Sequence, residues 1–99
     1  MKSTDIIVER LKKTKPQAII LFGSAARGEM TEDSDLDILV IKKTKKSFTD
    51  RMRDMRSMIR TSTPLDIIVL TPQEAKSLPK KNSFFAQILE EGKLLYGRI

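Results

Sequence analysis

Three short apolar runs divide the chain, and each has the length of a buried β-strand. They cover residues 17–22, 35–41 and 65–70, with isoleucine, leucine and valine as their commonest residues. Continuous apolar runs of this length are typical of strands that are covered on both faces. The sequence therefore predicts three strong strands, and residues 93–96 add a shorter candidate for an edge strand.

A helical pattern precedes the first strand. Ser3 or Thr4 can cap a helix that runs to about Lys13, and Pro16 prevents it from continuing. The apolar side of this helix has i, i+1, i+4 spacing and consists of Ile7, Val8 and Leu11.

A tight turn and a brief helix are predicted after the first strand. Gly23 and Ser24 form the turn, and Ser24 can cap a helix that runs through Arg27. Gly28 suits the C′ position after that helix. Residues 29–34 are polar and predict a loop.

The second strand leads into a lysine-rich loop, residues 42–46, and a basic amphipathic helix. Ser47 with Asp50 resembles a capping box, with aspartate in place of the usual glutamate. The apolar side of this helix has i, i+4, i+7, i+11 spacing and consists of Phe48, Met52, Met55 and Ile59.

A stronger capping box marks the helix after the third strand. Thr71 and Glu74 have its spacing, and Pro72 occupies the first helical position. Pro79 is expected to limit this helix to two turns at most, because proline lacks the N–H group that an interior turn requires.

A last helix is predicted to begin at Asn82 or Ser83 and to end at Gly92. It is expected to bury Phe84, Phe85, Ile88 and Leu89. Helices thus alternate with strands, without a repeat, a low-complexity tract or a linker between domains. The pattern predicts an α/β (α+β) fold in a single domain, residues 1–99, with helices packed on a small mixed sheet of three to four strands.

Composition limits the chemistry that any site can use. The chain has no cysteine and no histidine, which excludes thiolate metal ligands and removes the commonest general base. Any metal must be held by oxygen, which favours Mg²⁺ or Mn²⁺. With 39% hydrophobic and 32% charged residues, no run long enough for a bilayer and no secretory h-region, a soluble globular protein of the cytoplasm is expected.

Positive charge concentrates in residues 42–60. This segment has eight basic and two acidic residues, so its net charge of +6 equals that of the whole chain. It favours a polyanion or an acidic partner nearby, whereas the ordinary alternative is a solvated helix face and a lysine-rich loop. The methionines of this segment, Met52, Met55 and Met58, are either core residues or an adaptable binding face.

Aspartate interrupts the apolar runs at three positions. Asp35 and Asp37 lie in the second run and Asp66 in the third, although strands disfavour aspartate and a carboxylate beside a core is costly. Because side chains alternate, Asp35 and Asp37 share one face of their strand, and Asp66 can join them if the third strand lies beside the second. Such carboxylates repel one another. One or two divalent cations would relieve the repulsion and hold a phosphoryl group.

The turn after the first strand adds groups that bind phosphate. Gly23 allows the backbone to approach a phosphate, the Ser24 hydroxyl and the amides of the brief helix can donate to it, and Arg27 can pair with it. Each feature alone has an ordinary explanation, as a strand-to-helix turn, a surface arginine, a solvated strand end or an aspartate that keeps an edge strand soluble. The joint spacing, with ten residues between Ser24 and Asp35, favours a shared site for metal and phosphate.

Residues 23–37 therefore combine Gly-Ser, ten residues and Asp-x-Asp, which resembles the signature of the DNA polymerase beta-like nucleotidyltransferase superfamily. Within it, residues 23–28 (Gly-Ser-Ala-Ala-Arg-Gly) and 34–40 (Ser-Asp-Leu-Asp-Ile-Leu-Val) are similar to the minimal nucleotidyltransferases, the MNT-type antitoxins of HEPN/MNT toxin–antitoxin pairs. Asp66 occupies the position of the third carboxylate. The resemblance covers essentially the whole chain.

The resemblance implies a role for each carboxylate. Asp35 and Asp37 would bind two Mg²⁺ ions. Asp66 would bind the catalytic ion and help to deprotonate the attacking hydroxyl. The family reaction transfers a nucleoside monophosphate from ATP to a hydroxyl and releases pyrophosphate.

The resemblance also implies how substrate and acceptor are held. Gly23 and Ser24 would hold the triphosphate, and Arg27 would assist with its charge. No helical substrate-binding domain is expected after residue 99, so the acceptor would be a protein. We expect it to be a HEPN-type toxin that receives AMP on a tyrosine hydroxyl, which would make the chain a protein adenylyltransferase and an antitoxin.

Two alternatives stay open. A non-catalytic antitoxin would neutralise its partner by binding alone, with the carboxylates as a relic or a nucleotide sensor. A nucleic-acid-binding module would use the basic segment, although four phenylalanines and one tyrosine leave few aromatic side chains for stacking on bases.

Overall fold

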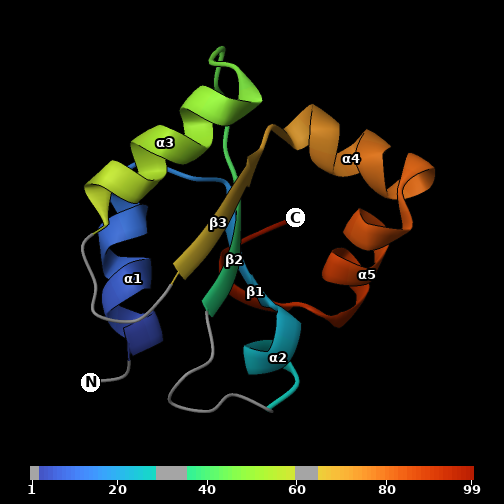
Figure 1. Cartoon of the computed structure of the whole chain (residues 1–99), viewed down its shortest axis with the longest axis horizontal. Coiled ribbons are helices and arrows are strands. Elements are labelled where there is room, and N and C mark those ends of the chain that lie inside the picture. The colour runs from blue at the N-terminus through green and yellow to red at the C-terminus, as the bar shows by residue number, and fades with distance from the viewer. Residues whose placement is uncertain (1–2, 29–35, 60–64) are drawn as a thin grey trace.

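In the computed structural model, which describes residues 3–28, 36–59 and 65–99, a four-stranded sheet has helices on both faces (Figure 1). The elements in chain order are α1 (Ser3–Lys12), β1 (Ala18–Phe22), α2 (Gly23–Ala26), β2 (Leu36–Ile41), α3 (Phe48–Met58), β3 (Leu65–Leu70), α4 (Pro72–Lys81), α5 (Ser83–Glu91) and β4 (Lys93–Gly97). Helices α1 and α3 cover one face of the sheet, and α4 and α5 cover the other. Within these ranges no helix is long and apolar enough to cross a membrane.

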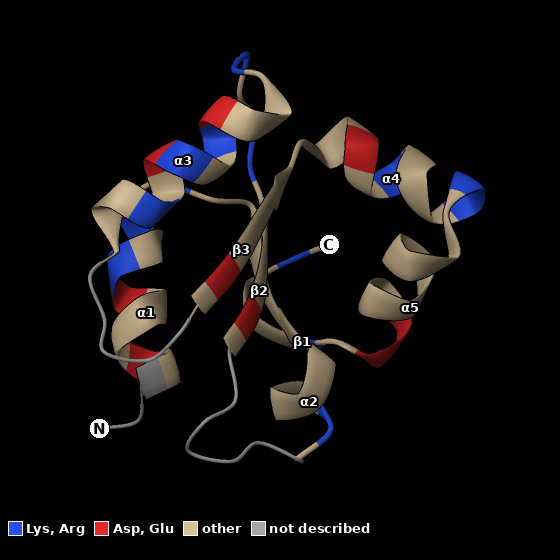
Figure 2. Cartoon of the chain, in the orientation of Figure 1, with Lys and Arg blue, Asp and Glu red and all other residues tan. Residues whose placement is uncertain are grey.

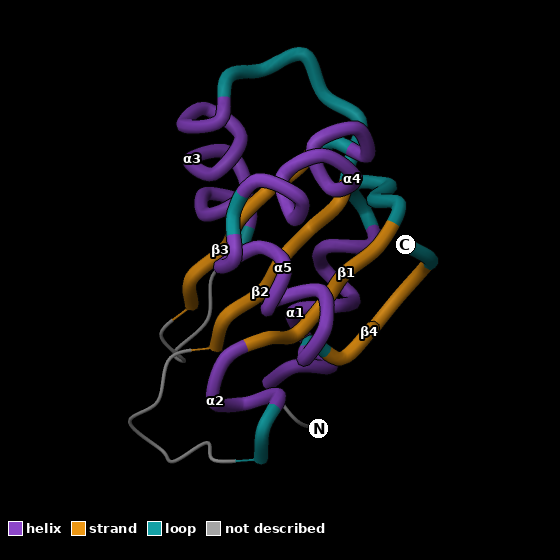
Figure 3. The backbone as a smooth tube through the Cα atoms, turned by 90° about the vertical axis from the view of Figure 1, so that its right-hand side faces the viewer, coloured by secondary structure: helices purple, strands orange, loops and turns teal. Residues whose placement is uncertain are grey.

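The sheet is mixed, as predicted. Its strand order is β3-β2-β1-β4. Strand β1 runs antiparallel to β2 and β4, whereas β2 runs parallel to β3. Figure 3 shows the strands side by side, with β4 at the edge next to β1, which confirms the predicted edge strand.

Alternation along the strands divides the core between the two faces. On β2, Leu36 and Ile38 are buried against α1 and α3, while Leu39 and Ile41 are buried on the side of α4 and α5. Because successive side chains of a strand point to opposite faces, Asp37 lies on the side of α4 and α5.

The structure corrects the predicted length of α4. The helix has 10 residues and continues past Pro79 to Lys81, instead of stopping after two turns. Pro79 lies in the last turn, where its missing N–H removes only one hydrogen bond of the helix. The N–H of Asn82 still donates to the Leu78 carbonyl at 2.8 Å, so the last turn closes around the proline.

Two phenylalanines that the pattern places on buried helix faces are exposed instead. Phe48, the first residue of α3, is 41% exposed, and Phe84, in the first turn of α5, is 50% exposed. The faces themselves are correct, because Met55 and Ile59 beside α1 and Ile88 of α5 are buried. Phe48 is the first residue of α3 and precedes the turns that pack on the core. Phe84 is exposed because it lines a pocket.

The basic segment balances part of its own charge. Four of its described basic side chains form ion pairs: Lys46 with Asp54, Arg51 with Glu74, Arg53 with Asp50 and Arg56 with Asp66. Figure 2 shows acidic residues among the basic ones of α3. Met55 is buried but Met58 is exposed, so the methionines do not all belong to the core. These pairs favour a solvated helix face over a continuous surface for a polyanion.

Arg51 connects α3 to β3 and α4. Its Nη1 atom donates to Glu74 Oε1 at 2.6 Å and to the Val69 carbonyl at 3.3 Å, and its Nε atom donates to the Lys46 carbonyl at 2.8 Å. Glu74 Oε1 also accepts from the Thr71 N–H at 2.8 Å, which completes the predicted capping box. Burial raises the pKa of Glu74, but the hydrogen bonds from Thr71 and the charge of Arg51 outweigh it and hold the pKa below its ordinary value.

The replacement Glu74→Gln is expected to lower the free energy of unfolding at neutral pH by about 1 kcal/mol. Glutamine keeps the capping hydrogen bond but loses the charge that faces Arg51, and partial exposure reduces the contribution of that charge. Because the folded-state pKa is lowered, this stabilisation is present above the unfolded value of 4.5 and is lost as the pH falls through the folded value. Urea unfolding at neutral and acidic pH should show a deficit that shrinks in acid.

Glu90→Gln is a matched control, because Glu90 is exposed on α5, and it should leave the neutral-pH stability unchanged. A deficit in Glu74→Gln that keeps the same size at every pH would contradict the role of the charge.

Candidate active site

The chain turns sharply at Gly23, directly after β1. Gly23 has a φ of +72°, a conformation that favours glycine. A Cβ atom at this position would overlap the Asp37 carboxylate. Phe22, the preceding residue, lies opposite Asp37 in the β1–β2 pair, so the sheet itself holds the turn beside the carboxylate.

Helix α2 differs from the prediction at its start. It begins at Gly23, with Phe22 at the N-cap position and no side-chain cap. Ser24 therefore lies inside the helix and does not cap it, because a capping residue needs extended backbone. The predicted end agrees with the structure: Arg27 is the C-cap, and Gly28 follows at C′ with a φ of +73°.

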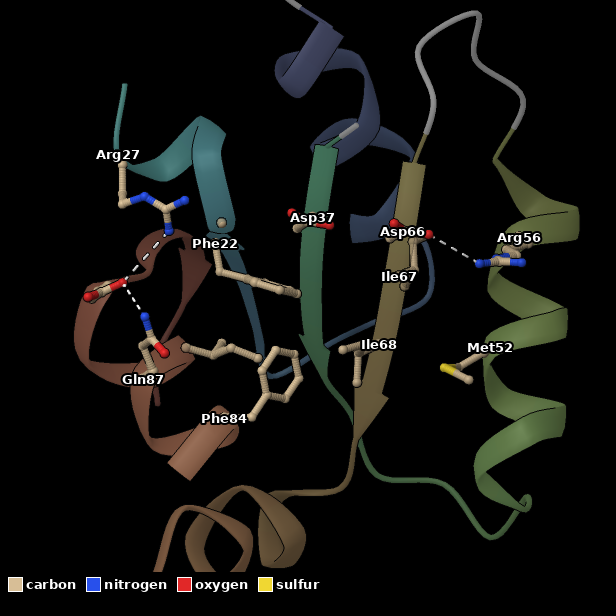
Figure 4. A pocket seen from close by; sticks show the side chains of 13 residues that line it. Phe22, Arg27, Asp37, Met52, Arg56, Asp66, Ile67, Ile68, Phe84 and Gln87 are labelled. Atoms are coloured by element: carbon tan, nitrogen blue, oxygen red, sulfur yellow. Dashed lines mark hydrogen bonds and ion pairs between the residues drawn. The ribbon is translucent and has the colours of Figure 1, made fainter. Parts of the chain in front are cut away.

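Asp37 and Asp66 lie side by side on neighbouring strands. They are partners in the parallel β2–β3 register, and both carboxylates lie near the same end of the two strands (Figure 4). Asp66 Oδ1 accepts a hydrogen bond of 3.4 Å from Nη2 of Arg56 on α3. The structure thus brings two of the predicted site residues together.

Asp35, the remaining predicted carboxylate, lies outside the described residues. In the three ranges that the structure describes, no group of three or more acidic side chains could hold a metal ion. The inclusion of Asp35 in a metal site with Asp37 and Asp66 therefore stays a prediction.

Both carboxylates line a pocket with a volume of about 440 Å³, a size typical of small-molecule sites. Its charged lining residues are Asp37, Asp66, Glu91, Arg27 and Arg56, and Gly23 lies beside them. Its apolar part includes Phe22, Met52, Ile68, Phe84 and Ile88. Such a pocket suits a ligand that has a charged end and an apolar end.

Arg27 reaches the pocket from the end of α2, and α5 supplies its partner. Arg27 Nη1 lies 3.9 Å from Glu91 Oε2, an oxygen that also accepts from Gln87 Nε2 at 3.3 Å. Figure 4 shows Arg27 and Arg56 on opposite sides of the carboxylates. Ser24 is described but does not line the pocket.

The sequence pattern missed two pocket residues. It assigns Phe84 to the core and includes Arg56 only as one member of the basic segment 42–60, whereas both line the pocket. A signal for Phe84 exists, because Phe84, Gln87, Ile88 and Glu91 have i, i+3, i+4, i+7 spacing, and this face of α5 mixes apolar and polar side chains. Arg56 has no such signal, since its position depends on how α3 packs beside β3.

Gly23→Ala is expected to destabilise the fold by about 2–3 kcal/mol, because left-handed backbone strain and overpacking against Asp37 both contribute. Gly28→Ala is the matched control: its φ is +73°, but nothing lies within 4 Å of an added Cβ. Backbone strain alone should cost about 1 kcal/mol there. Urea unfolding of the two variants compares these costs, and equal losses would contradict the close approach of Gly23 to Asp37.

The sequence relatives support an enzymatic site. Two proteins of Methanocaldococcus jannaschii, each named "Putative protein adenylyltransferase", are 38% identical to this chain over 88 residues and 29% identical over 85 residues. The first match covers 88% of this chain and 80% of the relative, and the second covers 86% and 84%.

Solved structures share the fold. A Sulfolobus solfataricus protein, described as "a putative nucleotidyltransferase", matches with a TM-score of 0.68 and 27% identity over 96% of this chain and 78% of that one. A toxin–antitoxin crystal structure with AMP-PNP matches with a TM-score of 0.66 and 22% identity, over 98% and 75%; at that identity the likeness shows the fold alone.

The family model described as "Polymerase beta, Nucleotidyltransferase" matches residues 5–98, which include Gly23, Asp37 and Asp66. This match covers almost the whole chain and agrees with the predicted superfamily. The chain belongs to the polymerase beta nucleotidyltransferase family and is a nucleotidyltransferase.

Proposed function

We propose that the protein is a Mg²⁺-dependent adenylyltransferase that transfers AMP from ATP to a hydroxyl of a partner protein, and that it acts as the antitoxin of a HEPN-type toxin. The observation that carries the proposal is the pair Asp37 and Asp66, side by side in a pocket that Gly23 also lines. The names of the M. jannaschii relatives and the AMP-PNP complex of the toxin–antitoxin neighbour support it.

The carboxylate pair fits Mg²⁺. Asp37 is half-buried and Asp66 is exposed, both line the pocket, and Mg²⁺ prefers carboxylate oxygens as ligands. Asp35 would add a third carboxylate, and together the three would hold two ions. Bound there, Mg²⁺ would neutralise the charge on the phosphate oxygens.

The chain's own residues bind the triphosphate and move the proton. Gly23 and Arg27 line the pocket and would contact the triphosphate there, and Ser24, which does not line the pocket, would assist from the adjoining turn. Asp66 takes the proton of the acceptor hydroxyl, whose oxygen attacks the α-phosphorus of ATP. The new P–O bond forms as the bond to the bridging β-phosphate oxygen breaks, and pyrophosphate leaves.

The proposed acceptor is a tyrosine hydroxyl of the toxin. The relatives named protein adenylyltransferases favour a protein acceptor, and the toxin–antitoxin neighbour favours a toxin as that protein. The pocket lies between α3 and α5, and both Arg56 and Phe84 at its sides are exposed. A side chain from another protein can therefore enter it.

Asp37→Asn is expected to weaken ATP binding in the presence of Mg²⁺ by more than about tenfold, because an amide cannot replace a charged metal ligand. Calorimetric titration of ATP measures this, with Mg²⁺ and with a chelator in its place. Asp5→Asn is the control, since Asp5 is exposed on α1, and its ATP affinity should equal that of the wild type. Equal affinity of wild type and Asp37→Asn would contradict a metal site at this carboxylate.

Transfer itself is tested with ATP that is labelled on the α-phosphate. The wild type should attach label to a co-expressed partner, and Asp37→Asn should attach none. If Asp37→Asn still neutralises the toxin in cells, the antitoxin acts by binding alone and the enzymatic proposal is wrong.

A further inference from the structure

Phe84 is held in a fixed position at the start of α5. Its backbone N–H donates to Asn82 Oδ1 at 2.8 Å, in the N-cap of that helix. Its side chain nevertheless stays 50% exposed, although burial of an aromatic side chain stabilises a fold. This exposed ring therefore needs an explanation other than core packing.

Two neighbouring rings fix the orientation of Phe84. Its centroid lies 6.3 Å from that of Phe22 at an interplanar angle of 84°, and 5.4 Å from that of Phe85 at 67°. Both are edge-to-face arrangements, which are favourable for aromatic pairs. These two contacts orient the ring before any ligand binds, and half of the residue remains accessible.

Phe84 lines the same pocket as the carboxylates (Figure 4). Phe22 links the two parts of this pocket, because it contacts Phe84 and lies opposite Asp37 in the β1–β2 register. Ile68 of β3 extends the apolar surface on the same side of the sheet. A nucleotide has its phosphates and its base at opposite ends of the ribose, so the charged and apolar parts of the pocket match its two ends.

We propose that Phe84 is the stacking residue of a nucleobase subsite, in which the base of the nucleoside triphosphate lies against the ring while its phosphates lie at Asp37 and Asp66. This inference rests on the proposed function and adds the part of the substrate that α5 holds. Gln87 lies one turn after Phe84 and lines the same pocket, but its amide donates to Glu91 Oε2 beside Arg27, so the ring is the part of α5 that we assign to the base.

A tryptophan at position 84 would report on stacking directly. The chain has no tryptophan, so Phe84→Trp introduces a single fluorophore. ATP with Mg²⁺ should quench its emission, whereas tripolyphosphate with Mg²⁺, which has no base, should not. Phe48→Trp is the matched control, because Phe48 is a similarly exposed phenylalanine, at 41%, that starts α3 and does not line this pocket; its emission should not respond to ATP.

Phe84→Ala tests the contribution to affinity. Calorimetry should show ATP binding weakened by about 5- to 100-fold, the range expected for loss of one base–aromatic stack, with tripolyphosphate binding unchanged. Phe84→Leu should show a similar loss while it retains apolar packing against Phe22. Thermal unfolding of each variant confirms that the fold persists.

The outcomes separate this inference from the proposed function. If the wild type binds ATP with Mg²⁺ but Phe84→Ala binds it equally well and Phe84→Trp is not quenched, the base subsite is wrong and the proposed function stands. If Phe84→Ala slows transfer to the partner without weakening ATP binding, Phe84 contacts the partner and the subsite is again wrong. If the wild type binds neither ATP nor tripolyphosphate, both proposals fail.

Discussion

Parallel hydrogen bonding between β2 and β3 sets Asp37 directly beside Asp66. A shift of one residue would turn Asp66 toward the face that α1 and α3 cover and would turn Ile67 out of it. Ile67 and Val69, both buried on that face, therefore fix the register. Burial of these aliphatic side chains stabilises an arrangement in which two carboxylates repel each other, and the rest of the pocket is built around this pair.

Distant segments of the chain complete the site around that register. The end of β1 comes close to Asp37 at Gly23. Glycine suits this position because a Cβ atom there would overlap the carboxylate. Helix α3 contributes Arg56 on one side, and α5 contributes Phe84 on the other. Each of the two helical layers thus forms one wall of the pocket, and the sheet between them supplies the two aspartates.

Local signals were sufficient to predict the strands and most helices, and they made the carboxylate pair conditional on adjacent strands. The three apolar runs and the capping box of Thr71 and Glu74 depend on neighbouring residues alone, so they are readable from the sequence. Asp37 and Asp66 could be paired as soon as their strands were taken to be adjacent, because alternation then decides the face. Even so, the pairing of β2 with β3 itself is a tertiary fact that no local pattern contains.

The errors arose where packing or a neighbouring turn decides the outcome. Phe84 has the spacing of a core residue, yet it faces a pocket whose opposite wall comes from β3 and α3. Ser24 has the chemistry of a cap, but the turn at Gly23 starts the helix before it. Pro79 breaks a helix only where more turns follow it. In each case the properties of the residue type were interpreted correctly, but its tertiary contacts cannot be read from the local sequence.

Arg56 offsets part of the negative charge at this site. Two adjacent carboxylates are unfavourable together, and the guanidinium 3.4 Å from Asp66 compensates one of them. Both partners are more than half exposed, and exposed ion pairs contribute only about 0–1 kcal/mol. Asp66 also lies on an edge strand, where a charge discourages pairing with other chains. Arg56 offsets the charge of Asp66, but breaking so weak an ion pair costs little free energy. Asp66 can therefore exchange Arg56 for a ligand that binds it more strongly.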